Sequence, residues 1–160
     1  MSVWGAVAGG FVGTLVLTTG LRAASEWGKT RMDIPFLLGT AFSRDRTRAK
    51  AIGYGLHFIA GQAFALVYYG VFAAIDESGW LLGALFGLLH AAFAGTALVN
   101  ILLPVVHPRM GTPSTAATGS PLLEPPGFMM LNYGRSTPIA SVLVHVAYGA
   151  IVGGFVSLAG

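Results

Sequence analysis

The sequence predicts an all-α protein, a transmembrane four-helix bundle, on two observations. Charged residues make up only 9% of the 160 residues and apolar residues 54%, whereas a soluble domain carries about 25% charged residues. Four apolar runs are also long enough to cross a bilayer core, which needs roughly 20 helical residues. These runs cover residues 3–24, 51–75, 80–106 and 138–158. We therefore expect the whole chain, 1–160, to be one integral membrane domain whose first partner is the lipid bilayer.

The first run, 3–24, precedes every basic loop residue of the chain. A secretory signal carries a basic segment ahead of its apolar core, and here nothing basic comes before Arg22. We therefore expect this run to be a membrane span. Cysteine is absent from the sequence, which excludes disulfides and thiolate metal sites.

The basic residues predict the orientation of the spans. Arginine and lysine lie only in or beside the first loop, 25–50, and the third loop, 107–137, whereas the short second loop carries Asp76 and Glu77. With four spans, the first and third loops share a side, and the positive-inside rule makes that side cytoplasmic and leaves both termini outside. The pI near 9.6 is then a consequence of topology and does not indicate a nucleic-acid partner. Anionic lipid headgroups are the expected partners of the first loop, at about 1 kcal/mol per basic residue.

Two short motifs recur at one spacing. "GAVAG" at 5–9 returns as "GALFG" at 83–87, and the "RM" that begins at Arg31 returns at Arg109, in both cases 78 positions later. This agreement favours an ancient duplication that produced two parallel helical hairpins. The second span then corresponds to the fourth, with a Pro-, Gly-, Ser- and Thr-rich insertion at 111–127 in the third loop.

Two apolar segments in the loops, "MDIPFLLGTAF" and "PPGFMMLNYG", are too short to span a membrane. Each follows or contains proline, which interrupts a helix. We expect them to lie at the membrane interface or to dip back among the spans, the latter only where protein covers their backbone polar groups. "SRDRTRAK", which follows the first segment, is expected to be a solvated charged face.

Small residues at helical spacing mark one face of every span, and such faces pack closely in membrane bundles. Three of these faces also carry a histidine, which directs the imidazole toward the interior of the bundle. The four faces are Gly5, Gly9 and Gly13; Gly53, His57, Gly61, Phe64 and Tyr68; Gly83, Gly87, His90 and Ala94; and Ser141, His145, Gly149 and Gly153. His57 and His145 lie at matching depths, about 10 Å from the loop side at roughly 1.5 Å per residue. We expect them to face each other from diagonal helices.

Two neutral imidazoles that face each other in a bundle can ligate a haem or, as the second choice, a transition metal. His57 and His145 are the expected ligands, with His90 as a third ligand or a proton relay. One alternative is a structural role, in which each imidazole bonds a hydroxyl or carbonyl group across helices, and another is a place along a substrate path. The available hydrogen-bond partners are Tyr54, Tyr68, Tyr148, Ser141 and Asn100.

The fourth histidine, His107, differs because "VVHPRMG" places it at the mouth of the third span, where water is at hand. With Met110, and with Met129 and Met130 further along the chain, it forms a candidate soft site for Cu(I). Methionine at an apolar interface is more often simple packing. Catalytic signatures such as H-E-x-x-H, G-x-S-x-G or a P-loop are missing, so we expect an enzyme only through an intramembrane cofactor.

Over "MDIPFLLGTAFSRDRTRAKAIGYGLHFIAGQAFALVYYGVF", "HPRMG" and "PPGFMMLNYGRSTPIASVLVHVAYGAIVGG", the chain resembles small four-span membrane proteins of actinobacterial type, a group of uncharacterised function. The resemblance covers most of the chain. It implies a multi-pass protein of a bacterial cytoplasmic membrane and identifies no functional residue. With the histidines, it leads us to expect an accessory or scaffold subunit of a membrane complex, or a homo-oligomer. The alternative is a small transporter or channel that works as an oligomer.

Overall fold

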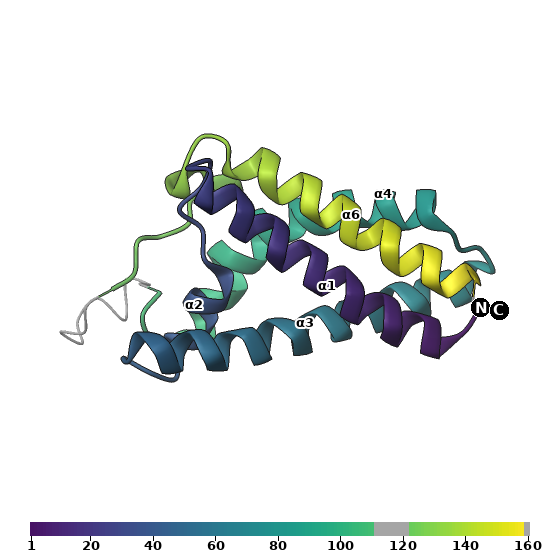
Figure 1. The fold of residues 1–160 in the computed structure, drawn as a ribbon, viewed down its shortest axis with the longest axis horizontal. Coiled ribbons are helices and arrows are strands. Elements are labelled where there is room, and N and C mark those ends of the chain that lie inside the picture. Colours follow the sequence, from purple (N-terminus) through teal and green to yellow (C-terminus); the bar gives the residue numbers. More distant parts are fainter. Residues whose placement is uncertain (111–121, 159–160) are drawn as a thin grey trace.

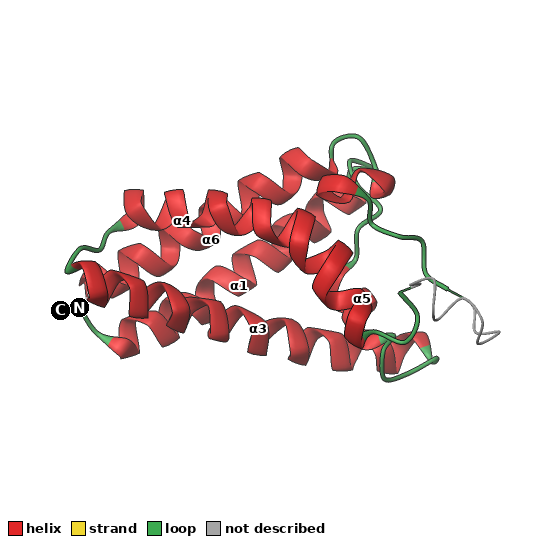
Figure 2. Ribbon diagram, turned by 180° about the vertical axis from the view of Figure 1, so that it is seen from behind, coloured by secondary structure: helices red, strands yellow, loops and turns green. Residues whose placement is uncertain are grey.

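The computed structural model describes residues 1–110 and 122–158, and all regular elements in this part of the chain are helices (Figures 1 and 2). Four helical spans are long and apolar enough to cross a membrane. The first, second and fourth are α1 (Val3–Glu26), α3 (Arg46–Ile75) and α6 (Thr137–Leu158), and the third consists of α4 (Trp80–Phe93), η1 (Ala94–Leu102) and α5 (Leu103–Val106). The predicted all-α class with four spans is confirmed, and the chain is a small multi-pass membrane protein.

The spans run back and forth so that the two long loops lie at one end of the bundle and both termini at the other (Figure 1). We call the loop end the basic end, because it carries all nine Lys and Arg residues. α6 packs against both α1 and α4, and α1 also packs against α3. α3 and α6 lie on a diagonal with few close approaches, as expected for the second and fourth spans.

The glycine faces allow these helices to approach closely. A Cβ on Gly149 of α6 would overlap the carbonyl oxygen of Gly83 in α4, and a Cβ on Gly87 would overlap that of His145. On the other side of α6, a Cβ on Gly13 of α1 would lie 2.8 Å from the ring of Tyr148. Backbones therefore meet where the sequence predicted small-residue faces, and this prediction is confirmed.

The second span begins earlier than the apolar run predicted. α3 starts at Arg46 instead of Ala51, and the side chain of Asp45 caps it by accepting the backbone N–H of Arg48 at 2.8 Å. An aspartate cap satisfies an amide that the first helical turn leaves free, so the helix continues outward through its charged residues. The predicted charged face is therefore the exposed first turn of a helix.

The first apolar loop segment forms a short helix, α2 (Ile34–Gly39), that packs against the start of α3. Glycine makes this contact close on both sides, because a Cβ on Gly39 would overlap the carbonyl of Ala49 and a Cβ on Gly53 would overlap that of Pro35. The segment therefore folds back onto the protein, which covers its backbone polar groups as a buried loop requires.

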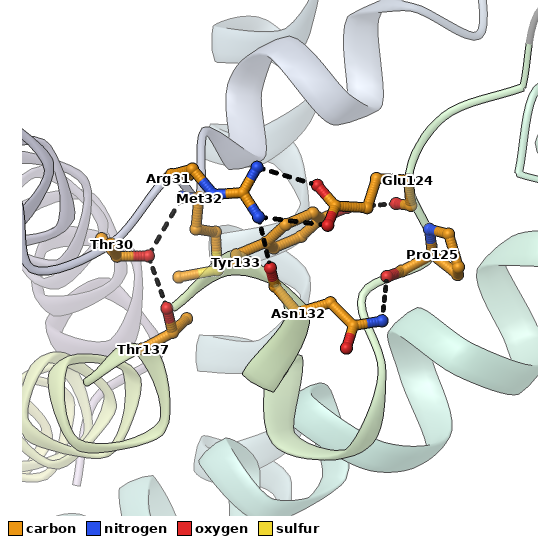
Figure 3. Close-up of polar contacts among 8 residues, drawn as sticks. All are labelled: Thr30, Arg31, Met32, Glu124, Pro125, Asn132, Tyr133 and Thr137. Carbon is orange, nitrogen blue, oxygen red and sulfur yellow. Dashed lines mark hydrogen bonds and ion pairs between the residues drawn. The ribbon is translucent and has the colours of Figure 1, made fainter. Parts of the chain in front are cut away.

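The second apolar loop segment forms the 3₁₀ helix η3 (Phe128–Tyr133), and polar contacts join it to the first loop (Figure 3). Arg31 bonds to the Glu124 carboxylate at 3.1 Å and to the Asn132 carbonyl at 2.6 Å. The Arg31–Glu124 pair is exposed and stabilises by about 1 kcal/mol or less. Burial, and then the negative charge of Glu124, raise the pKa of Tyr133, so its hydroxyl stays protonated and donates to the Glu124 carbonyl at 2.9 Å. Residues 111–121 of the predicted insertion lie outside the described residues.

The third span contains a π-helical stretch, η1, that no sequence pattern indicated. The Asn100 amide donates to the carbonyls of Gly95 and Thr96, both at 3.1 Å, and to the carbonyl of Gly127 before η3 at 3.0 Å. One side chain thus bonds to the widened turn and holds the second loop segment against it. Beyond this stretch the span crosses toward α3 (Figure 2). Wide turns of this kind are frequent at functional sites.

Candidate ligand-binding chamber

The bundle contains a chamber of about 210 Å³ in the half nearer the basic end. All four spans line it, and α2 and η3 close it on the loop side. Its apolar lining includes Leu17, Leu21, Leu37, Leu38, Phe64, Leu98, Val99, Leu103 and Met130, and its polar lining consists of Thr14, His57, His90, Ser141, His145 and Tyr148. The change of direction at η1 positions Leu98 and Leu103 in this wall. The chamber is therefore an apolar space with a few polar groups directed into it.

Three of the four histidines line this one chamber. His57 comes from α3, His90 from α4 and His145 from α6. The rings of His90 and His145 meet edge to face with centroids 4.9 Å apart, and the ring of Phe64 lies 3.9 Å from that of His90. The three histidines predicted from the glycine faces thus share one site, and His90 is a direct neighbour of His145.

Hydrogen bonds fix the ring of His145. Its Nδ1 lies 2.7 Å from the backbone carbonyl oxygen of Ser141, one helical turn earlier. A carbonyl oxygen only accepts, so Nδ1 must carry the hydrogen, and in the neutral imidazole Nε2 is then an acceptor. The hydroxyl of Tyr68 lies 3.2 Å from Nδ1 of His90. Tyr68 on α3 thus bonds to His90 on α4 across helices, as the structural alternative predicted, whereas Ser141 holds His145 through a backbone carbonyl of the same helix.

His57 has a ring nitrogen without a partner. Its Nε2 is buried and makes no hydrogen bond. Buried polar side-chain atoms are nearly always paired, and an unpaired one costs about 1–3 kcal/mol. A molecule that occupies the chamber and bonds to His57 would offset this cost.

A haem does not fit these residues. An apolar cavity of about 150 Å³ takes up one benzene molecule, so a chamber of about 210 Å³ holds a single substituted ring but no macrocycle. The expected axial pair is His57 and His145, and the volume of the chamber argues against a macrocycle between them; His90, the expected third ligand, touches the ring of His145 directly. Among residues 1–110 and 122–158, no three His, Asp or Glu side chains are placed to share a metal ion.

His107 is buried, not water-exposed as its place in the sequence suggested, with 2% of its surface accessible. Its Nδ1 accepts the backbone N–H of Arg109 at 3.2 Å, and its Nε2 lies 2.9 Å from the carbonyl of Leu37 in α2. Both ring nitrogens are therefore occupied, which leaves no lone pair for copper. Met110 is buried at 4% exposure without lining the chamber. The proposed soft site of His107 and Met110 is not formed, because His107 instead joins the end of the third span to α2.

Removing this imidazole should weaken the fold. We expect His107→Ala to lower the free energy of unfolding by about 1–3 kcal/mol, because the Arg109 amide loses a buried acceptor and the ring leaves a void. Thermal unfolding followed by circular dichroism in mild detergent measures the change, with Val106→Ala, at a 75% exposed neighbour, as the control. Unchanged stability together with loss of bound copper would contradict this structural role.

Tyr148 lines the chamber from α6 and connects to the diagonal helix α3, and Tyr68 of α3 packs beside it without lining the chamber. The Tyr148 hydroxyl donates to the carbonyl of Gly61 on α3, and the rings of Tyr68 and Tyr148 lie 5.8 Å apart. Beyond them, toward the termini, Phe72, Val152 and Val156 fill the interior with no exposed surface. The chamber is therefore closed on that side.

Comparison of the chain with protein-family models, with curated proteins and with solved structures finds no match.

Proposed function

We propose that this protein binds a small, mainly apolar, uncharged molecule in the chamber and holds it by hydrogen bonds to the imidazoles. The observation that carries the proposal is the meeting of three histidines from three spans in one apolar chamber, with the Nε2 of His57 unpaired. Pockets with apolar walls and a few convergent polar groups are the usual form of small-molecule sites. Nε2 of His145 is an acceptor, so the ligand should offer an O–H or N–H group.

The size of the chamber limits the ligand to about one ring or a short chain. It is slightly larger than the space that holds benzene, and the face of Phe64 offers a flat apolar contact beside His90. Polar residues inside a membrane protein are costly and mark functional sites by default. A hydroxylated ring combines these requirements, so we take para-fluorophenol as the test molecule.

Fluorine NMR of para-fluorophenol with the protein in lipid nanodiscs tests this function. We expect a bound signal that is absent from empty nanodiscs and at least about tenfold weaker binding in Ala60→Leu, because the larger side chain occupies space that the ligand needs. Ala63→Leu is the matched control, since Ala63 is exposed on the same helix whereas Ala60 lines the chamber. Equal binding by both variants would count against the chamber as the site.

A role in binding suits the expected accessory subunit of a membrane complex better than the alternative of a transporter. A transport path would have to continue past the chamber, where Phe72, Val152 and Val156 fill the interior and the backbones of α4 and α6 touch at Gly83 and Gly149. Transport would therefore need a second copy of the chain or a large rearrangement of the bundle.

We also propose that the protein sits in a bacterial cytoplasmic membrane with its basic end inside, as the positive-inside rule indicates. Because the sequence has no cysteine, the reactivity of a single introduced cysteine shows on which side of the membrane that position lies. Glu77→Cys should react with a membrane-impermeant maleimide in intact cells, and Arg44→Cys only after lysis. The reverse pattern would place both termini inside.

A further inference from the structure

A polar cleft of about 360 Å³ lies beside the chamber at the basic end. It is formed by the last turns of α1, the loop that leads into α2 and the first turns of α3. Its walls carry hydroxyl groups, including those of Ser25 and Tyr54, and two ion pairs. The chamber and the cleft therefore differ in chemistry although they are adjacent, since one is almost wholly apolar and the other is polar.

The wall between the two spaces is thin. Four residues, Leu21, Met32, Ile34 and His57, line both the cleft and the chamber. Leu21 and Met32 are 5% and 3% exposed, so both residues are buried where the two spaces adjoin. His57 is the polar member of the four, and its buried Nε2 has no partner. A rotation of these side chains would join the cleft to the chamber, and side-chain rotations are fast.

The charges in the cleft are already balanced. Arg22 Nε lies 2.9 Å from a carboxylate oxygen of Glu26, and Lys50 Nζ lies 2.9 Å from one of Asp33. A second bond also holds Asp33, because its other carboxylate oxygen accepts the backbone N–H of Phe36 in α2 at 3.0 Å. An ionic group that entered the cleft would have to displace one of these partners. An uncharged group can bond to the hydroxyls and to the free carboxylate lone pairs without breaking either pair.

Resting on the proposed function of the chamber, we infer that the cleft is the entrance and the polar subsite for its ligand. The ligand is an uncharged amphiphile that bonds to the imidazoles through an O–H or N–H group inside the chamber and extends a second uncharged hydrogen-bonding group past His57 into the cleft. The ligand therefore enters at the basic end between α1 and α3. Entry of the ligand from the lipid, between α3 and the third span, would contradict this inference.

Cysteine labelling in the cleft tests the entrance. Ser25→Cys lines the cleft, and Thr47→Cys is exposed at the same end but outside it. After reaction with fluorescein maleimide in nanodiscs, the Ser25→Cys protein should take up para-fluorophenol at least about tenfold more slowly than before labelling, whereas the labelled Thr47→Cys protein should be unchanged. Unchanged uptake by the labelled Ser25→Cys protein would overturn the entrance and leave the chamber intact. Failure of both unlabelled proteins to bind para-fluorophenol would overturn the proposed function of the chamber itself.

Probes of one shape and different charge test the ligand class. We expect para-fluorobenzyl alcohol to bind at least about tenfold more tightly than para-fluorobenzoate and para-fluorobenzylammonium, because only the alcohol leaves both ion pairs intact. Equal or tighter binding of either ion, measured by the same fluorine NMR titration, would show that the cleft selects a charged ligand and would overturn this class.

Discussion

Replacing Gly149 by leucine is expected to prevent stable assembly of the bundle. A Cβ on Gly149 would overlap the carbonyl oxygen of Gly83 and lie 2.7 Å from the backbone nitrogen of Gly87. These are backbone atoms, which no side-chain rotation moves away, so α4 and α6 must separate along their whole contact. Overpacking a core costs about 1–3 kcal/mol and occasionally more, and backbone overlap belongs to the upper end of this range.

Yield of monodisperse protein by size-exclusion chromatography, with helix content by circular dichroism, measures this effect. Gly154→Leu is the matched control, because a Cβ there meets only the Cβ of Trp80 at 3.9 Å and the change in helix propensity is the same. We expect the control to fold normally. A Gly149→Leu protein as stable as the Gly154→Leu protein would contradict the close packing of α4 on α6.

His145→Leu is expected to abolish most ligand binding while the protein still folds. The substitution removes the Nε2 acceptor from the chamber, so a ligand hydroxyl that enters is left unpaired at a cost of about 1–3 kcal/mol, or roughly 5- to 150-fold in affinity. The Ser141 carbonyl loses one donor but remains within a helix, so stability should change little.

The comparison of His145→Leu with His107→Ala separates binding from folding. Removal of His107 should lower stability and leave the affinity for para-fluorophenol unchanged. Removal of His145 should lower that affinity and leave stability nearly unchanged. If both variants lose stability to the same extent and neither changes the affinity, the imidazoles of the bundle serve packing alone.

Periodicity predicted the helix faces correctly because the bilayer leaves few choices. In lipid, backbone groups must bond within the segment, so long apolar runs become helices, and small residues at helical spacing show where these helices touch. The faces through Gly149 and His57 therefore lie inside the bundle as predicted. The proposed duplication stays a prediction, since no comparison tests it.

The loops and the third span could not be predicted in the same way. α2 packs on α3 because Gly39 and Gly53 allow backbone contact across separate elements, which no local pattern reveals. η1 depends on the amide of Asn100, which also reaches Gly127, so its cause is tertiary. The burial of His107 has the same origin, because its partner on α2 lies 70 residues away in the chain. The volume of the chamber could not be predicted from the sequence either, and it is this volume that argues against a haem.

Photo-crosslinking with a diazirine-bearing phenol, followed by peptide mapping, tests most directly whether the three histidines surround a ligand site. We expect adducts on chamber residues from different spans, such as Phe64, Leu98 and Tyr148, and their loss when para-fluorophenol is added in excess. Adducts confined to lipid-facing residues such as Val67 and Leu143, which are 59% and 64% exposed, and unaffected by the competitor, would contradict this expectation.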